Sequence, residues 1–342
     1  MEQNQLELEN QLFNMMWGYC VSGALRTAAE LDIADHLKEN SRTADELATA
    51  IGCHAHSLYR LMRALATVGI FKQKGDQFSL TPLGNLLRSD TPRSQRHLTI
   101  EMCRYFEEWG QLTQTIKTGK PPKENIYNEL LVTEEQAQSF YDGMDSFYYG
   151  NPAPMLGHYD FSGVQTVADI GGASGSQLIA VLKHYPHLKG ILFDLPDTVK
   201  RSQANIDAAG LAERCCTVGG SFFDSIPSGA DVYLIRHVLH NWNDEKCVEI
   251  LSNIRKVLPD QGKMLVIETL VPSDNEKCTT AWHELSLAEK SIASWWDLSM
   301  FVVDDGAERT QQEYAQLFAK AGLKLSRVLP TNIDVSLIEG TH

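Results

Sequence analysis

Short apolar runs alternate with predicted helices through the second half of this chain. The apolar runs have the length of strands, and they cover residues 167–170, 191–193, 215–218, 230–236 and 264–268. Helices are predicted between them, over residues 176–182, 197–209 and 244–257. This alternation predicts an α/β domain whose parallel sheet is covered on both faces. Thr310 then opens a last helix with a capping box, and residues 323–328 and 335–339 fit a closing antiparallel pair.

The first quarter of the chain has a different pattern. Residues 12–25 are apolar almost all round if they form a helix, and such a helix must be covered on several sides. A second subunit is a natural cover, which predicts an obligate homodimer; burial against the chain's own second domain is the alternative. A helix with a capping box at Thr43 follows, then a helix over residues 57–68 and two short strands around Gly75-Asp76. These elements form a winged helix-turn-helix pattern.

A winged helix suggests a second function class, a DNA-binding regulator, and charge argues against it. Residues 43–90 hold five Lys or Arg against four Asp or Glu, and the 342-residue chain has a net charge of −14. A DNA reader needs a basic face, so we expect neither nucleic acid nor an anionic membrane as partner. The N-terminal residues do not resemble a signal peptide, no apolar run could span a bilayer, and the seven cysteines are unpatterned. These features predict a cytoplasmic protein with reduced thiols.

Candidate chemistry begins where the first strand of the α/β region ends, at Asp169-Ile-Gly-Gly-Ala-Ser-Gly. The three glycines break the strand, and Ser176 is a candidate N-cap for the next helix. A glycine-rich turn from strand to helix lets a ligand approach the backbone at the helix N-terminus. Asp194 closes the next strand, where a carboxylate accepts hydrogen bonds from ribose hydroxyls. The pattern predicts an adenosine-type cofactor, and it lacks the G-x-G-x-x-G spacing of a nicotinamide-linked dehydrogenase.

Polar side chains gather at the carboxyl ends of all five predicted parallel strands. They are Asp169, Asp194, Ser221 with Phe222, the segment 236–242, and Glu268. Ligands of open α/β sheets bind at this edge, so the five strand ends predict one shared site. The sequence shows no His/Asp cluster with ligand spacing, and we expect no metal.

Several longer motifs follow one another along the chain. They are Thr81-Pro-Leu-Gly, Leu87-Arg-Ser-Asp, Gly119-Lys-Pro-Pro, Phe193-Asp-Leu-Pro, Gly220-Ser-Phe-Phe, His240-Asn-Trp-Asn-Asp, Val266-Ile-Glu and Glu308-Arg-Thr. With them, nearly the whole chain resembles the S-adenosylmethionine-dependent small-molecule O-methyltransferases of plant phenolic and bacterial natural-product metabolism. The resemblance implies an N-terminal α-helical winged-helix dimerisation domain and a Rossmann-like class I methyltransferase domain. The expected division is a dimerisation domain over 1–100, a helical connector contributing to the substrate pocket over 101–160, and a catalytic domain over 161–342.

The resemblance also implies S-adenosyl-L-methionine as cofactor. The loop at Gly171 would cradle its methionine part, Asp194 would bind the ribose hydroxyls, and Ser221 and Phe222 would flank the adenine. Arg236 stands where the family usually has a lysine near the cofactor. The implied cofactor contacts are Asp169, Gly171, Gly172, Gly175, Asp194, Leu195, Ser221, Phe222 and Arg236.

For catalysis, the resemblance implies that His240 is the general base and that Glu268 and Glu308 hold and polarise its ring. A phenol with a pKa of about 10 is mostly protonated at neutral pH, and a histidine with a pKa of about 6.5 can take its proton during attack. The acceptor would be a small secondary metabolite with a phenolic or enolic hydroxyl. Its implied contacts are Trp109, Phe140, Met144, Asn241, Trp295, Met300 and Asp304.

Three positions depart from the family's usual pattern. Ala173 replaces the middle glycine of the loop, Ser221 replaces an aspartate near the adenine, and Asn241 replaces the aspartate after the base. Alanine resists a positive φ, so we expect an effect on loop geometry or cofactor affinity. Two alternatives stay open: a metabolite-binding transcriptional regulator, and a relative that binds the cofactor but catalyses another reaction.

Overall fold

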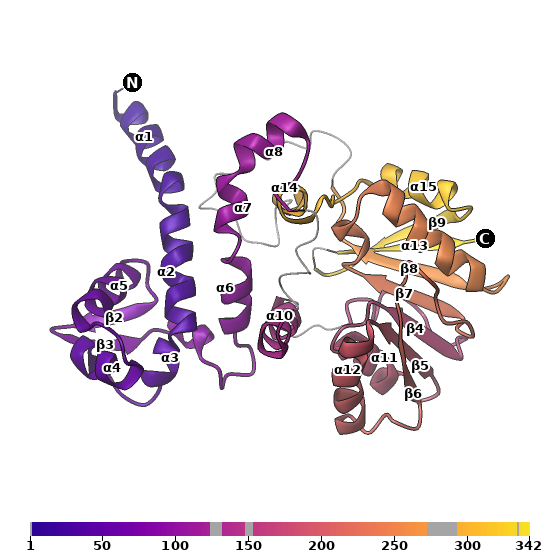
Figure 1. The fold of residues 1–342 in the computed structure, drawn as a ribbon, viewed down its shortest axis with the longest axis horizontal. Helices are drawn as coiled ribbons and strands as arrows, with labels where there is room; N and C mark the ends of the chain where they lie inside the picture. The colour runs from indigo at the N-terminus through magenta and orange to yellow at the C-terminus, as the bar shows by residue number, and fades with distance from the viewer. Residues whose placement is uncertain (1, 124–131, 148–152, 272–292, 334) are drawn as a thin grey trace. The chain divides into compact units, whose positions relative to one another are not determined.

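A computed structural model describes residues 2–123, 132–147, 153–271, 293–333 and 335–342 (Figure 1). The chain forms two compact units. The first consists of residues 1–106 and 130–150, and the second of residues 107–129 and 151–342. The segment 101–160, expected to act as one connector, is therefore divided between the two units.

The first unit is mainly helical. Its elements are α1 (Glu2–Met16), α2 (Gly18–Glu30), α3 (Ile33–His36), β1 (Arg42–Thr43), α4 (Ala44–Ile51), α5 (Ala55–Thr67), β2 (Phe71–Lys74), β3 (Gln77–Leu80), the 3-10 helix η1 (Gly84–Leu87), α6 (Arg96–Met102) and α10 (Glu134–Phe147). Strands β1, β3 and β2 form a small antiparallel sheet in that order. The helix pair α4–α5 followed by the β2–β3 hairpin is the predicted winged-helix arrangement.

The helix start and helix end predicted in this unit are present in the structure. Thr43 caps α4, and its side chain and that of Glu46 complete the capping box. Gly52 ends the helix at φ 80°. Leu58 and Met62 of α5 are buried in a core that α2, α3, α4 and the hairpin share.

The start of the first unit keeps its apolar side chains in solvent. Eight large apolar side chains between Leu6 and Tyr19, on α1, at Trp17 and in the first turn of α2, are each 53–69% exposed. They are Leu6, Leu8, Leu12, Phe13, Met15, Met16, Trp17 and Tyr19. Further along α2, Ala24 and Leu25 pack against the core of the winged helix. Within this chain, the predicted apolar segment 12–25 is therefore exposed at its start and packed against the core at its end.

The second unit contains a seven-stranded sheet in the order β6-β5-β4-β7-β8-β10-β9. Its strands are β4 (Thr166–Ile170), β5 (Lys189–Asp194), β6 (Cys215–Gly219), β7 (Val232–Arg236), β8 (Lys263–Glu268), β9 (Lys324–Pro330) and β10 (Ser336–Thr341). Its helices are α8 (Leu112–Thr118), α11 (Ser176–His184), α12 (Pro196–Ala208), the 3-10 helix η2 (Leu239–Asn241), α13 (Asp244–Val257), α14 (Ala293–Asp304) and α15 (Gln311–Lys320), while α7 (Phe106–Gly110) begins at the boundary. Strands β4 to β8 are parallel, and β10 and β9 close the sheet antiparallel.

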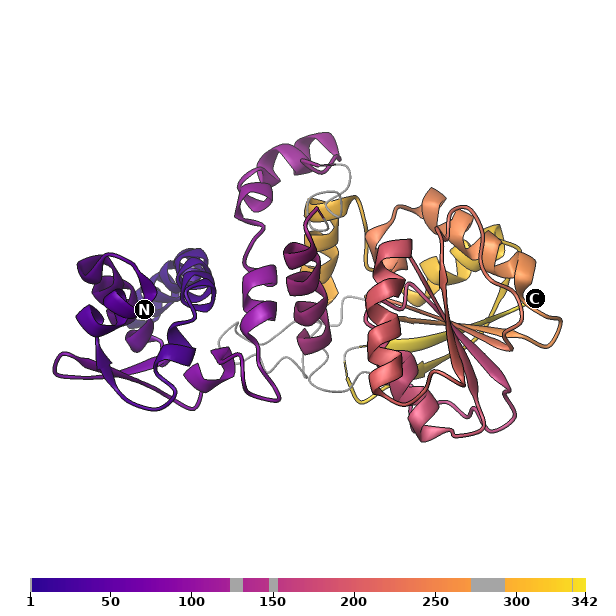
Figure 2. The same ribbon diagram turned by 60° about the horizontal axis from the view of Figure 1, so that its bottom comes forward.

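Helices cover both faces of this sheet (Figures 1 and 2). Alternate residues of one strand enter different cores: Tyr233 and Ile235 pack with α13 and α15, whereas Val232 and Leu234 pack with α11 and α12. The predicted α/β class is confirmed. Among the described helices, none combines the length and apolar character that crossing a bilayer requires.

Candidate active site

The glycine loop connects β4 to α11. Gly171 and Gly175 have φ values of 72° and 81°. Gly175 occupies the N-cap position and Ser176 is the first helical residue, so the predicted cap at Ser176 is wrong. Ala173 adopts φ 46°, the positive φ that alanine was expected to resist. The backbone strain of this loop therefore lies at Ala173.

Close packing explains why side chains are excluded from the glycines of this loop. A Cβ on Gly171 would lie 2.8 Å from Val238 Cγ2, and one on Gly175 would lie 2.8 Å from Leu192 Cδ1. A Cβ on Gly172 would lie 3.0 Å from Leu192 Cγ. The glycines therefore allow this turn to pack closely against Val238 and Leu192, where any larger side chain would collide.

Asp169 lies near the end of β4, just before this loop, and within the described part of the chain only one of its carboxylate oxygens accepts a hydrogen bond. Its Oδ1 accepts a hydrogen bond from Gln177 Nε2 at 2.9 Å, while its buried Oδ2 has no hydrogen-bond partner among the described residues. Burial raises the pKa of Asp169 to about 7, against the opposing effects of Gln177 and the Arg236 guanidinium. A buried acceptor of this kind suits a cationic ligand group.

Asp194, at the end of β5, holds the loop from the neighbouring strand. Its Oδ2 accepts a hydrogen bond from Ala173 N at 2.9 Å, and its Oδ1 accepts one from Leu195 N at 2.7 Å. The Thr198 side chain donates a third hydrogen bond to this carboxylate. An ionised carboxylate has about four acceptor positions, so it can still accept from a ribose hydroxyl. Burial raises its pKa, although these backbone groups lower it.

Ser221 and Phe222 follow the next strand, β6. Ser221 Oγ accepts a hydrogen bond from Phe223 N at 3.2 Å, and Phe222 packs edge-on against the ring of Phe223. Asn253 Nδ2 donates to the carbonyl oxygens of Phe222 and Phe223 at 2.9 Å each. The turn that carries both predicted adenine contacts is thus fastened to α13.

The predicted base lies on η2, just after β7. Glu268, at the end of β8, is fully buried, and its Oε1 accepts hydrogen bonds from the backbone N–H groups of Val238, Leu239 and His240 at 3.0–3.4 Å. Glu268 was expected to hold the imidazole ring. Its shortest contacts instead hold the backbone of the turn, and its Oε2 lies 3.7 Å from His240 Nδ1.

Glu308 makes the short contact to the ring of His240. Its Oε1 lies 2.7 Å from His240 Nδ1, which donates to it when Nδ1 carries the proton. Nε2 is then left with a lone pair. Burial alone would lower the pKa of His240, but Glu268 and Glu308 outweigh it and raise the pKa to about 9. The ordinary histidine value expected from the sequence does not hold at this position.

His237 is a neighbour to which the sequence patterns gave no role. Its Nδ1 lies 3.5 Å from Glu268 Oε2, and its ring centroid lies 5.0 Å from that of His240. Its φ is 47°, and its carbonyl oxygen accepts a hydrogen bond from Asn241 Nδ2 at 3.1 Å. Ligand-bearing atoms of His237, His240 and Glu268 lie within 4.8 Å of one another, so the structure assembles a cluster that sequence spacing did not reveal.

Gly306 and Ala307, which precede Glu308, contact the backbone of His240. Ala307 N donates to His240 O at 2.9 Å, and a Cβ on Gly306 would collide with that same carbonyl oxygen. Arg309 is buried, and its guanidinium donates to the carbonyl oxygens of Leu239 and Trp242 at 3.3 and 2.8 Å. Gly306 and Arg309, on either side of Glu308, were the sequence features that could have indicated these contacts.

The residues predicted to contact the acceptor are distributed over both units. Met300 and Asp304 lie on α14, which packs against η2, and Asp304 is buried. Trp295 also lies on α14 but is 52% exposed, and Trp109 lies on α7. Phe140 and Met144 lie on α10 in the first unit. All of these assignments stay predictions.

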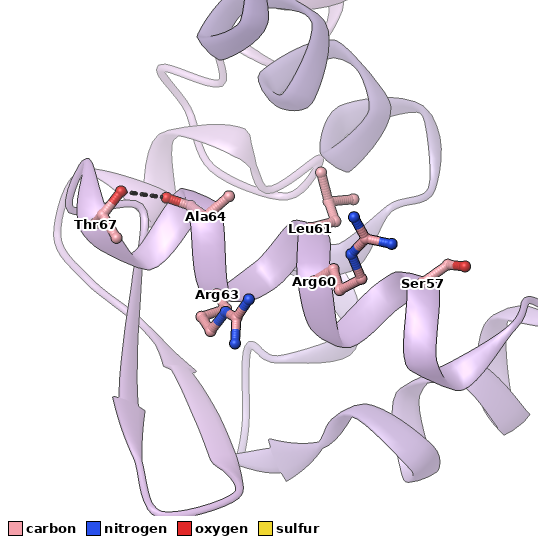
Figure 3. A pocket seen from close by; sticks show the side chains of 6 residues that line it. All are labelled: Ser57, Arg60, Leu61, Arg63, Ala64 and Thr67. Atoms are coloured by element: carbon pink, nitrogen blue, oxygen red, sulfur yellow. Dashed lines mark hydrogen bonds between the residues drawn. The ribbon is translucent and has the colours of Figure 1, made fainter.

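A shallow hollow runs along α5 of the winged helix (Figure 3). It is lined by Ser57, Arg60, Leu61, Arg63, Ala64 and Thr67. Two arginines can neutralise about two phosphates, fewer than the roughly 6–10 phosphate contacts of a typical DNA-binding protein. This hollow gives no support to DNA recognition.

Two family models match the chain. The one described as an O-methyltransferase domain matches residues 109–324, and the one described as an O-methyltransferase dimerisation domain matches residues 13–90. Among curated proteins, a phenazine O-methyltransferase from Lysobacter antibioticus is 34% identical, over 97% of this chain and 96% of its own length.

Solved structures are similar over the same length. The mitomycin 7-O-methyltransferase superimposes with a TM-score of 0.90 at 31% identity, covering 100% of both chains. An O-methyltransferase from neocarzinostatin biosynthesis, solved with S-adenosylmethionine and 2-hydroxy-5-methyl naphthoic acid, gives a TM-score of 0.79 at 31% identity, covering 94% of this chain and 95% of its own.

Proposed function

Since this chain belongs to the O-methyltransferase family, we propose that it methylates a hydroxyl group of a small secondary metabolite with His240 as general base. The observation that carries this proposal is the 2.7 Å contact between His240 Nδ1 and Glu308 Oε1. It orients a buried imidazole with Nε2 as the proton acceptor. The strand ends around it supply a glycine loop and two carboxylates at the edge where ligands of such sheets bind.

The cofactor is S-adenosyl-L-methionine, and the residues present fit it. Asp169 Oδ2 is a buried acceptor that would bind its ammonium group, and the backbone of the glycine loop would border its methionine part. Asp194 accepts from the ribose hydroxyls, and Phe222 faces the adenine. When bound, the cofactor supplies a methyl group on a positively charged sulfur. Arg236 lowers the pKa of Asp169 and thereby favours its carboxylate form.

His240 prepares the acceptor for attack. Its neutral form takes the hydroxyl proton on Nε2, so that the acceptor oxygen could attack the methyl group that the bound cofactor would supply. Glu308 then stabilises the imidazolium through Nδ1, and Glu268 keeps the η2 backbone in place. Positioning the two reactants accounts for most of the rate, because methyl transfer from a sulfonium is an in-line displacement.

The acceptor carries a phenolic or enolic hydroxyl on a flat, apolar body. Met300 and Asp304 of α14 line its side of the site, because α14 packs against the turn that bears the base. Within the second unit, Trp109 and Trp295 supply further apolar surface, and Asn241 a polar contact. Phe140 and Met144 of α10 stay predictions from the sequence. The naphthoic acid bound by the neocarzinostatin relative is a compound of this class.

The protein acts as a homodimer that associates through its N-terminal residues. The exposed apolar side chains of α1 and the start of α2 include Phe13 and Trp17, each 53% exposed, within the region that the dimerisation-domain model matches from residue 13. A patch of this kind is characteristic of an association surface.

The test replaces His240 by Ala and follows binding and turnover separately. Calorimetry with S-adenosylmethionine should give nearly the wild-type affinity, while methyl transfer from labelled cofactor should fall by about 10²-fold or more. Unchanged turnover would contradict the base assignment. Binding without methyl transfer in the wild-type protein, across hydroxylated aromatic acceptors, would favour a relative with a different reaction.

A further inference from the structure

The cluster of His237, His240 and Glu268 has the composition of a zinc site. Two imidazoles and one carboxylate form a known three-ligand set for Zn²⁺ that leaves a fourth position open. Mg²⁺ and Ca²⁺ prefer oxygen ligands, so two imidazole nitrogens favour a transition metal. The three residues come from two strand ends, β7 and β8, and lie in the interior of the second unit.

The distances fit a tetrahedral ion. Bonds of about 2.0–2.1 Å place neighbouring ligand atoms about 3.4 Å apart. Glu268 Oε2 lies 3.5 Å from His237 Nδ1 and 3.7 Å from His240 Nδ1, and all three ligand atoms lie within 4.8 Å of one another. Binding an ion then requires His240 Nδ1 to exchange its contact with Glu308 Oε1 for the metal.

A second observation points to a ligand at the same place. Glu268 is fully buried, its Oε1 is committed to the η2 backbone, and its Oε2 has no hydrogen-bond partner among the described residues. That oxygen faces both imidazoles. A buried carboxylate oxygen left in this state is stabilised by a cation.

The backbone holds His237 in the required place despite its conformation. His237 N donates to Ile267 O at 3.2 Å, and Asn241 Nδ2 donates to His237 O at 3.1 Å. These two bonds fix a non-glycine residue at φ 47° beside the end of β8. Strain of this kind persists where the surroundings determine the position of a side chain.

We propose that His237, His240 and Glu268 bind Zn²⁺ and that the bound ion switches off the base. Nδ1 of His240 has one lone pair in its plane, and it cannot both coordinate a metal and donate a proton to Glu308. With Zn²⁺ on Nδ1, the neutral ring carries its proton on Nε2, and that nitrogen no longer accepts the proton of the acceptor hydroxyl. The inhibition rests on the proposed role of His240, whereas the binding of metal does not.

The experiment measures binding without any methyl transfer. The purified full-length protein, treated with chelator and dialysed, is titrated with Co²⁺, whose four-coordinate complexes absorb visible light, and Zn²⁺ is then added to displace it. We expect one equivalent of each ion and an absorption spectrum without sulfur-to-metal charge transfer. The His237→Asn variant, whose side chain tolerates the positive φ, should bind at least about 10-fold more weakly. His184→Asn, an exposed position on α11, should bind as the wild type does.

Wild-type methyl transfer is then measured against Zn²⁺ concentration. The midpoint of inhibition should equal the Zn²⁺ dissociation constant derived from the displacement of Co²⁺, with the affinity for S-adenosylmethionine unchanged in calorimetry. Absence of a Co²⁺ spectrum, a spectrum with sulfur ligands, or equal binding by His237→Asn would overturn the site. Should that variant fail to fold, X-ray absorption of the zinc-loaded wild type must show two imidazoles, and any other ligand set overturns the site. Metal binding at His237 without inhibition would refute the switch, whereas the assignment of His240 as base is tested separately by the turnover of His240→Ala.

Discussion

Replacing Glu308 by Gln removes one charge from the contact that sets the protonation of His240, while keeping the size of the side chain. Burial lowers the pKa of His240 and the two glutamates raise it, to about 9. A general base acts in its neutral form, so about 1% of the free enzyme is competent at pH 7 and about 50% at pH 9. We therefore expect kcat/KM to rise about 50-fold between these pH values. In Glu308→Gln the pKa falls towards its ordinary value, and the rise should shrink to less than about 10-fold.

The assay is kcat/KM for the acceptor at saturating S-adenosylmethionine between pH 6 and 10, because this quantity reports the ionisation of the enzyme without acceptor. Glu249→Gln, an exposed position on α13, removes the same charge and should keep the wild-type profile. His240→Ala isolates the ionisation of the acceptor itself. The same midpoint in wild type and Glu308→Gln would refute the reasoning that this carboxylate controls the base.

Two further predictions concern the loop and the subunit contact. Ala173→Gly should raise the free energy of unfolding by about 0.5–1 kcal/mol in denaturant titrations, because glycine adopts φ 46° without strain. The matched Ala180→Gly, inside α11, should lower it by about 1 kcal/mol. A lower free energy of unfolding in both variants would contradict the strain at Ala173. Replacing both Phe13 and Trp17 by Asp should lower the mass in analytical ultracentrifugation from that of a dimer to the 38.2 kDa of one chain. Ile116→Asp, at an exposed apolar position on α8, should leave the dimer intact. A dimer that survives the double substitution would place the contact elsewhere.

The parts of the structure that short-range signals determine could be predicted from the sequence. Strand β7 and helix α13 lie where apolar runs and helical spacing indicated, and Thr43 and Thr310 form the expected capping boxes. The parallel direction of β4 to β8 followed from their alternation with helices. Each of these features depends on residues close together in the chain.

Three features that depend on residues distant in sequence were not predicted, although the family resemblance implied that Glu308 and His240 come together. His237 and Glu268 are 31 positions apart, and only the pairing of β7 with β8 brings them together. The positive φ of Ala173 depends on a hydrogen bond to Asp194 from another strand. The resemblance implied both carboxylates beside His240, but the raised pKa depends on how closely two separate segments bring them to the buried ring, which no local pattern gives.

The segment that supplies Glu308 is also fastened to α14. Asp297 Oδ1 accepts a hydrogen bond from Glu308 N at 3.1 Å, and Gly306 N donates to Met300 O at 3.3 Å. Residues on α14, the helix proposed to border the acceptor, therefore help to position the carboxylate that raises the pKa of His240. Acceptor range and catalytic rate are then not independent traits during evolution. A lineage that enlarges its pocket through α14 must regain the placement of Glu308 by compensating substitutions, which restricts the order in which new specificities can arise.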